Sequence, residues 1–274
     1  MFPISLILPE MPTIRIVDIG AMTAGDDPYA RLAEQLPCEI IGFEALEEEC
    51  RRLNAMGKAG CTFLPYVIGD GSAQTFYECA VPYTSSLLEP NLPLLERFTG
   101  FAEMARVVAR RPVATRRLDD VPQAAGADYL KVDVQGGELM VLDGAARTLR
   151  SALVVHIEVE FVPLYKNQPL FADIDARLRA AGFALHKLPF TGLRPFKPFA
   201  LDSGILSQLL WGDAVYVRDF MSFEALLPEQ LLKLAAILHE NYNSCDLAAE
   251  ALRVYDSKAG SSLHPLYVSY VSAR

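Results

Sequence analysis

The sequence predicts an α/β fold in which helices connect the strands of a parallel sheet. Along the first 220 residues, short hydrophobic strand patterns alternate with amphipathic helix patterns, a succession typical of parallel strands joined by right-handed crossovers. The chain has 274 residues, of which 51% are hydrophobic, so it can bury one large core. We therefore expect an α/β domain over residues 1–220 and a helical extension over residues 221–274.

The first part of the sheet is predicted from strand patterns that end in turn residues. Strands are expected at residues 14–19, 38–44 and 62–68, with a short extra strand at residues 74–79. Asp27 and Pro28 supply an N-cap and a first-turn proline for a helix that runs to about Leu36. Gly57 closes a second helix over residues 45–56. Residues 81–127 are less regular, with a helix expected around residues 92–109 and an extended piece at residues 113–116.

The remaining strands complete the predicted sheet. We expect a fourth strand that ends at Asp133, a helix over residues 138–149, and strands at residues 154–160, 183–188 and 213–218. Pro169 opens an amphipathic helix between the fifth and sixth strands, and Gly182 ends it. Beyond Phe220, helices over residues 223–240 and 244–255 carry apolar stripes at helical spacing. These stripes need a packing partner, either the core of the domain or a second subunit.

Charged residues interrupt the fourth and fifth strands, although strands of a parallel sheet are normally apolar on both faces. Side chains alternate along a strand, so Lys131 and Asp133 share one face of the fourth strand. On the fifth strand, His156, Glu158 and Glu160 share a face in the same way. Unpaired buried charges are costly. These groups should therefore pair, with Lys131 and Glu158 as a cross-strand pair, or face the crevice at the carboxyl ends of the strands, where ligands bind.

Acidic residues near the ends of the first three strands indicate the cofactor. A dinucleotide fold needs G-x-G-x-x-G, but Met22 stands where the second glycine belongs and its side chain would obstruct a pyrophosphate. S-adenosylmethionine has no pyrophosphate, and Asp18 with the Gly20 turn suits its methionyl amino and carboxylate groups. Glu44 can accept hydrogen bonds from both ribose hydroxyls, and Asp70 from the adenine amino group. Each acid also has a local structural explanation, as a turn cap or an acid at a helix N-terminus.

Composition and charge argue against several classes of partner. The formal net charge of −9 argues against nucleic acid, because phosphate binding needs clustered Lys and Arg. The five cysteines show no C-x-x-C spacing, so neither a zinc site nor a disulfide framework is indicated. The amino terminus is a poor signal peptide, and no apolar run is long enough to span a bilayer. We expect a cytoplasmic protein.

Eight sequence motifs, in a fixed order, resemble those of a known family. They lie at residues 17–21, 41–44, 64–71, 84–90, 115–120, 129–138, 158–169 and 213–218. The chain resembles the FkbM family of S-adenosylmethionine-dependent methyltransferases. This resemblance implies a class I methyltransferase fold, which is Rossmann-like, with an antiparallel seventh strand, and it implies O-methylation of a sugar or secondary-metabolite hydroxyl. Met22 stands where many members carry Asn, and Gln135 where many carry Glu. The helices after Phe220 lie outside the resemblance.

Methyl transfer from a sulfonium to a hydroxyl needs a group that relieves the acceptor oxygen of its proton. Asp133 is the first candidate for this role, and His156 and Glu158 come next, although a hydrogen-bonded core histidine is the simpler explanation of His156. The candidate acceptor-binding residues are Ser85, Ser86, Glu160 and Tyr165. Asp133, Glu158 and Glu160 could suit magnesium, but no ligand spacing requires it. A metal is therefore not part of the prediction.

Two other functions stay open. A catalytically silent protein could keep the fold as a cofactor-sensing or assembly module, with the carboxy-terminal helices as its working surface. A nicotinamide oxidoreductase is less well supported because of Met22. For the enzyme, we expect a small-molecule or glycan hydroxyl as acceptor, no nucleic acid or membrane partner, and room for a homo-oligomer through the carboxy-terminal helices.

Overall fold

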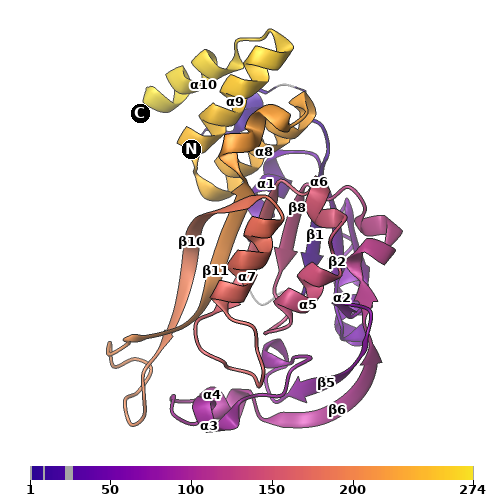
Figure 1. The fold of residues 1–274 in the computed structure, drawn as a ribbon, viewed down its shortest axis with the longest axis vertical. Helices are drawn as coiled ribbons and strands as arrows, with labels where there is room; N and C mark the ends of the chain where they lie inside the picture. The colour runs from indigo at the N-terminus through magenta and orange to yellow at the C-terminus, as the bar shows by residue number, and fades with distance from the viewer. Residues whose placement is uncertain (1, 9, 22–26, 274) are drawn as a thin grey trace.

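A seven-stranded sheet forms the centre of the computed structural model, which describes residues 2–8, 10–21 and 27–273 (Figure 1). The strands are ordered β3-β2-β1-β8-β9-β11-β10. Their bounds are β1 Ile14–Ile19, β2 Cys38–Phe43, β3 Cys61–Leu64, β8 Tyr129–Val132, β9 Val154–Glu160, β10 Phe183–Arg194 and β11 Gln208–Arg218. The strands from β3 to β9 pair in parallel, whereas β11 is antiparallel to both of its neighbours. The predicted mostly parallel sheet with an antiparallel seventh strand is confirmed.

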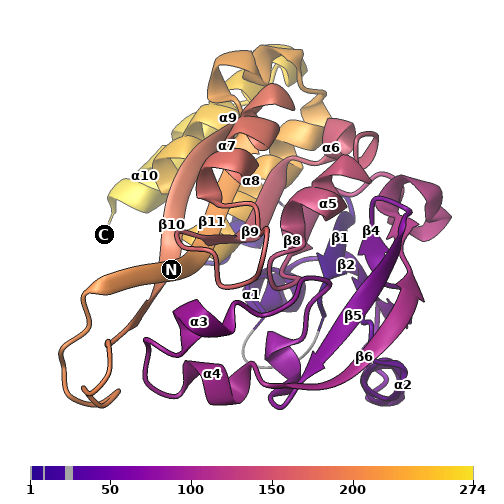
Figure 2. The ribbon, with the colours of Figure 1, turned by 60° about the horizontal axis from the view of Figure 1, so that its bottom comes forward.

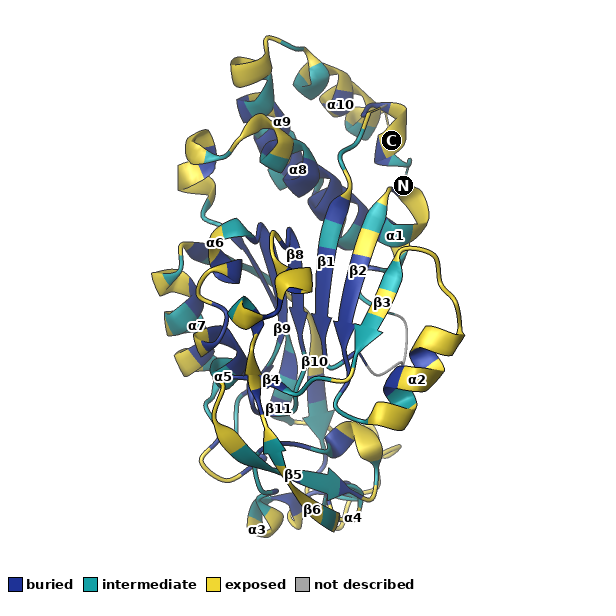
Figure 3. Ribbon diagram, turned by 90° about the vertical axis from the view of Figure 1, so that its right-hand side faces the viewer, coloured by how far each residue is buried: buried dark blue, intermediate teal, exposed yellow. Residues whose placement is uncertain are grey.

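Helices cover both faces of this sheet. The face that carries Ile16 and Tyr129 packs against α1 (Ala30–Gln35), α8 (Pro228–Tyr242) and α9 (Cys245–Ala259). The face that carries Val17 and Leu130 packs against α5 (Glu138–Asp143), α6 (Thr148–Ser151) and α7 (Phe171–Ala180). Helix α2 (Glu47–Ala55) lies beside β3, and α10 (Leu263–Ser272) lies against α9. The central strands between these layers are largely buried, as Figure 3 shows in dark blue.

Two small two-stranded sheets, β4 with β7 and β5 with β6, lie outside the central sheet. The strand predicted at residues 62–68 ends at Leu64, because Pro65 cannot donate to the ladder. Ile68 instead begins β4 (Ile68–Gly69), which pairs with β7 (Arg116–Arg117). The predicted strand at residues 74–79 is confirmed as β5 (Ala73–Cys79), which pairs antiparallel with β6 (Val107–Ala114). Figure 2 shows β5 and β6 beside the short helices α3 (Leu92–Leu95) and α4 (Phe101–Met104).

Several predicted helix bounds were wrong, each for a local reason. The helix predicted at residues 92–109 is split into α3 and α4 by Gly100, which has φ +76°. The helix predicted at residues 138–149 is interrupted at Gly144, where an added Cβ would lie 2.0 Å from the Gly69 carbonyl oxygen. Helix α1 begins at Ala30 with Tyr29 at the N-cap position, so the prediction of Asp27 as the N-cap residue is wrong. The 3-10 helices are Ile4–Leu6, Pro82–Thr84, Leu118–Asp120, Pro122–Ala124 and Phe220–Ala225.

The last two strands are longer than predicted. β10 continues to Arg194 and β11 begins at Gln208, so together they form a long hairpin that projects from the rest of the fold (Figures 1 and 2). This extension brings Phe190 and Trp211 to the carboxyl ends of the parallel strands.

The carboxy-terminal helices cover the core rather than leaving their apolar stripe open. Leu231, Leu234 and Ile237 of α8 are fully buried in the same apolar cluster as β1. The hydroxyls of Tyr242 and Tyr129 form a hydrogen bond of 2.8 Å between α8 and β8. Helix α10 was not among the predicted elements. No helix of the described residues is long and apolar enough to cross a membrane.

Candidate active site

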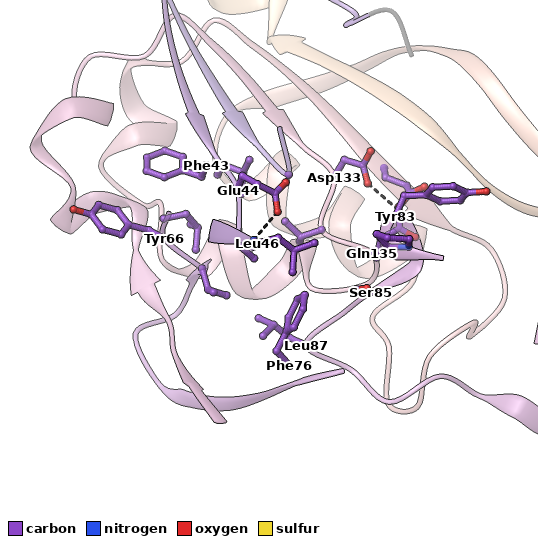
Figure 4. Close-up of a pocket in the computed structure, with 18 of the residues that line it drawn as sticks. Phe43, Glu44, Leu46, Tyr66, Phe76, Tyr83, Ser85, Leu87, Asp133 and Gln135 are labelled. Carbon is purple, nitrogen blue, oxygen red and sulfur yellow. Dashed lines mark hydrogen bonds between the residues drawn. The ribbon is translucent and has the colours of Figure 1, made fainter. Parts of the chain in front are cut away.

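A cavity of about 560 Å³ opens at the carboxyl ends of β1, β2 and β8 (Figure 4). These strands include the point where the strand order reverses, since β1 lies between β2 and β8, and ligands bind at such points in open α/β sheets. The residues that line the cavity include Gly20, Phe43, Glu44, Tyr66, Phe76, Tyr83, Ser85, Asp133, Gln135, Glu158 and Trp211.

Gly20 lets the ends of β1 and β8 approach closely beside this cavity. Its φ is +84°, and an added Cβ would lie 1.8 Å from the carbonyl oxygen of Asp133. The amide of Asp133 in turn donates to the carbonyl of Ile19 at 2.9 Å. Only glycine fits this position without moving the backbone. The side chain of Asp133, 40% exposed, therefore lines the cavity immediately beside the Gly20 turn.

Glu44 follows β2 and is buried at the cavity wall. Its Oε1 accepts a hydrogen bond of 2.7 Å from the amide of Leu46, drawn as a dashed line in Figure 4. Burial raises the pKa of the Glu44 carboxyl, and the Leu46 amide offsets part of that rise. Within the described residues the second oxygen has no hydrogen-bond donor, so it can accept hydrogen bonds from a ligand, which is the chemistry a diol requires.

Asp18 and Lys131 form a buried ion pair behind the Gly20 turn. The Lys131 Nζ lies 3.1 Å from Asp18 Oδ1 and 3.8 Å from Asp133 Oδ2, and it donates to the Gly20 carbonyl at 2.9 Å. Tyr29 donates to the other oxygen of Asp18 at 2.6 Å. Burial opposes the ammonium charge, but Asp18 and Asp133 together raise the pKa of Lys131 above its usual range. The predicted Lys131–Glu158 pair is wrong, because Lys131 lies opposite Asp18 and His156 in the register.

Gln135 connects the acidic side chains in front of the sheet. Its Nε2 donates to Asp133 Oδ1 at 2.9 Å and to Glu158 Oε2 at 2.6 Å. Its Oε1 accepts from the Tyr165 hydroxyl at 3.3 Å. Gln135 has φ +57°, a conformation that is uncommon for a residue other than glycine. One amide therefore joins the side chains of Asp133 and Glu158.

Three glutamates lie around Gln135, of which Glu138 and Glu160 are buried and Glu158 is half-buried. Burial, with the charges of Asp133 and other nearby acids, raises the pKa of Glu158 well above its usual range, and burial with Glu138 and Asp133 does the same for Glu160. Burial also raises the pKa of Glu138 to about 7, although the amides of Val134 and Gly136 donate to its Oε1. Folding therefore shifts each glutamate toward its protonated form, Glu158 and Glu160 most strongly.

A second cavity, of about 110 Å³, lies next to the first. The two cavities share Tyr83, Gln135, Glu158 and Trp211 as lining residues. Glu160 and Tyr165, both predicted to bind the acceptor, line this smaller cavity, and so does Arg194. Among the described residues, no group of three or more His, Cys, Asp or Glu side chains is arranged to hold a metal ion.

A family model of the methyltransferase FkbM domain matches residues 18–185. The chain belongs to this family. No curated protein sequence matches the chain. Two similar solved structures are a proposed methyltransferase from Thermoplasma acidophilum, 9% identical (80% of this chain, 75% of that chain, TM-score 0.39), and a proposed tRNA (m1A22) methyltransferase from Streptococcus pneumoniae, 12% identical (92% and 97%, TM-score 0.36).

Not all predicted site residues of this FkbM domain meet at the cavities. Asp70 is exposed and accepts hydrogen bonds from the amide and hydroxyl of Ser72, which lower the pKa of its carboxyl. Ser86 donates to the Gln135 carbonyl at 2.6 Å. His156 contacts the Tyr242 hydroxyl at 3.1 Å and Asp213 at 3.5 Å. None of Asp70, Ser86 and His156 is a lining residue of either cavity.

Ser85 does line the larger cavity, and its Oγ accepts from the Cys79 amide at 3.1 Å. Asp18 lies behind the Gly20 turn. Lys131 connects the two, because it pairs with Asp18 and donates to the Gly20 carbonyl. Met22, which weighed against a dinucleotide, lies outside the described residues.

Sequence reasoning missed the aromatic walls of the FkbM site and gave Gln135 no role. The missed wall residues are Phe43, Tyr66, Phe76, Tyr83, Phe190 and Trp211. Two signals were present: Trp211 is the single tryptophan of the chain, and Gln135 continues the alternation of polar residues begun by Lys131 and Asp133 in the sequence.

Proposed function

We propose that this FkbM-family protein transfers a methyl group from S-adenosylmethionine to a hydroxyl of a sugar or secondary metabolite. One observation carries the proposal: Gly20, Glu44 and Asp133 follow three neighbouring strands and line the same cavity. The formal charge of −9 supports a small-molecule or glycan acceptor over nucleic acid.

The large cavity suits the cofactor in size and in chemistry. Its volume of about 560 Å³ is within the range of small-molecule sites. Gly20 makes room for the backbone of Asp133, which places the Asp133 side chain at the cavity, and Glu44 presents a carboxylate for the ribose hydroxyls. Val67, Ile68 and Tyr66 supply an apolar wall that suits an adenine ring, so the proposal no longer needs Asp70. S-adenosylmethionine, when bound, would supply an electrophilic methyl group.

Asp133 is the group best placed to take or orient the acceptor proton. Its carboxylate is 40% exposed and lines the large cavity, while Gln135 holds one of its oxygens. Glu158 lines the same cavity, but burial and nearby acids favour its protonated form, in which it is a poor base. His156 is held on the α8 side of the sheet by Tyr242. We therefore assign the proton-accepting role to Asp133 before Glu158 and His156.

The test compares Asp133→Asn with Asp213→Asn. Both aspartates are similarly exposed, at 40% and 36%, but Asp213 is not a lining residue of either cavity. In Asp133→Asn, methyl transfer to a panel of sugar acceptors should fall about a hundredfold or more, with little change in S-adenosylhomocysteine affinity. Asp213→Asn should keep most of the rate. Wild-type turnover in Asp133→Asn would remove the assignment.

A binding titration tests the cofactor separately from the acceptor. The wild-type protein should bind S-adenosylmethionine and S-adenosylhomocysteine with micromolar affinity and should not bind NAD. Binding of NAD alone would favour an oxidoreductase, and binding of none of the three would favour a silent module.

A further inference from the structure

The smaller cavity continues the larger one away from Glu44. The two cavities meet at Tyr83, Gln135, Glu158 and Trp211, and Figure 4 shows Tyr83 and Gln135 beside Asp133. An acceptor whose hydroxyl lies at Asp133 would therefore extend toward the smaller cavity. A volume of about 110 Å³ is too small for a sugar ring and its substituents, but it can hold a group the size of a few water molecules.

Arg194 supplies a positive charge to this smaller cavity. Its guanidinium carbon lies 5.0 Å from the centre of the Phe101 ring and 5.8 Å from that of Trp211, so two aromatic rings hold it in place. Its Nε is buried and has no hydrogen-bond acceptor within the described part of the chain. Among the same described residues, its Nη2 has only a weak acceptor, the Met104 sulfur at 3.9 Å. A buried donor without an acceptor is costly, so a ligand oxygen here would satisfy it.

Glu158, Glu160 and Tyr165 also line the smaller cavity. Glu158 and Glu160 favour their protonated forms, because burial and nearby acids raise the pKa of both. Tyr165 also keeps its proton, since burial and nearby acids raise the pKa of its hydroxyl, and it donates that proton to the Thr84 carbonyl at 2.9 Å. With both acids protonated, Arg194 carries the remaining charge among the lining residues. Such a surface attracts an anion.

We propose that the smaller cavity binds a carboxylate of the acceptor, with the Arg194 guanidinium as its cation. The planar guanidinium fork matches a carboxylate better than an ammonium does. This inference rests on the proposed function and names its substrate class: a hydroxylated acid, such as a uronic acid, whose ring lies in the larger cavity beside Asp133.

The experiment measures binding of D-glucuronate and D-glucose to the protein saturated with S-adenosylhomocysteine. The two probes share a ring and most of their hydroxyls and differ in the carboxylate. Wild-type protein should bind glucuronate about tenfold or more tightly than glucose, and Arg194→Gln should lose that preference while its S-adenosylhomocysteine affinity is unchanged. Arg194→Lys keeps the charge but lacks the fork, so it should keep only part of the preference.

Arg110→Gln is the matched control, because Arg110 also lies over an aromatic ring, that of Tyr77 at 5.6 Å, and is not a lining residue of either cavity. It should bind glucuronate as the wild type does. Equal binding of both sugars, no binding of glucuronate, or an unchanged preference in a folded Arg194→Gln would each overturn the inference. If Arg194→Gln does not fold, the comparison of glucuronate with glucose on the wild-type protein decides whether the site prefers a carboxylate. A protein that binds S-adenosylhomocysteine but shows no carboxylate preference loses this inference and keeps the proposed function.

Discussion

Replacing Lys131 by Met should destabilise the protein strongly, because it leaves a buried carboxylate without its cation. The Lys131 side chain is 11% exposed and that of Asp18 only 1%, and the pair is 3.1 Å apart. Breaking a buried pair of this kind costs about 3–5 kcal/mol. The loss of the hydrogen bond to the Gly20 carbonyl adds about 1 kcal/mol. Urea unfolding at neutral pH, followed by circular dichroism, measures the change in the free energy of unfolding.

Two controls separate this cost from a general effect of removing a lysine. Lys166 is 51% exposed and pairs with Glu89 at 2.9 Å, so Lys166→Met should cost less than about 1 kcal/mol. The double variant Lys131→Met with Asp18→Asn removes both charges and should recover at least about 1 kcal/mol relative to Lys131→Met alone. If Lys131→Met costs no more than Lys166→Met, or if the double variant recovers nothing, the buried ion pair does not stabilise the turn.

Three further predictions follow from the site and the tail. Glu44→Ala should weaken S-adenosylmethionine binding by about 1–3 kcal/mol in a calorimetric titration, because a charged hydrogen-bond acceptor is lost. Asp70→Ala should change this affinity little, and an equal loss in both variants would mean that Asp70 also contacts the cofactor. Glu138 has its pKa raised from 4.5 to about 7, so the folded protein binds more protons and should lose stability as pH rises through this window. Glu138→Gln should therefore gain up to about 3 kcal/mol in urea unfolding above pH 8 and nothing near pH 4, and an equal gain at both pH values would contradict the charge explanation. Deleting residues 221–274 should expose the apolar face that α8 covers and cause aggregation in light scattering, so a soluble, active truncation would show that the tail is dispensable.

The sequence predicted the strands well where alternation and turn residues agree. β1, β2, β5 and β9 lie within one or two residues of their predicted bounds, since their patterns end at glycine, proline or charged residues. The irregular segment between β5 and β8 was predicted poorly, because its pairing is set by distant partners. β4 forms through the pairing of Ile68 with Arg116, and no local sequence pattern predicts this pairing.

The sequence identified the charged positions of the site but not their partners. It predicted that Lys131 must pair or face a crevice, because the cost of an unpaired charge is independent of the register. The identity of the partner depends on which strands are neighbours, and Lys131 turns toward β1 rather than β9. Arg194 was missed for a related reason. It lies beyond the predicted end of the sixth strand, in the hairpin whose length depends on pairing with β11.

Lys131 lies closer to one of its two carboxylate partners than to the other, and this difference explains how one face of the sheet can hold both a structural and a reactive carboxylate. Asp18 is the nearer partner, at 3.1 Å, while Asp133 is at 3.8 Å on the cavity side. The ammonium therefore pairs more closely with the buried Asp18 beneath the Gly20 turn than with Asp133. Asp133 receives a weaker attraction and one amide donor from Gln135, which hold its carboxylate in place without a closely paired cation. A glutamate at position 135 would replace that donor by a third acid beside Asp133 and Glu158, and the glutamine of this chain avoids that added repulsion.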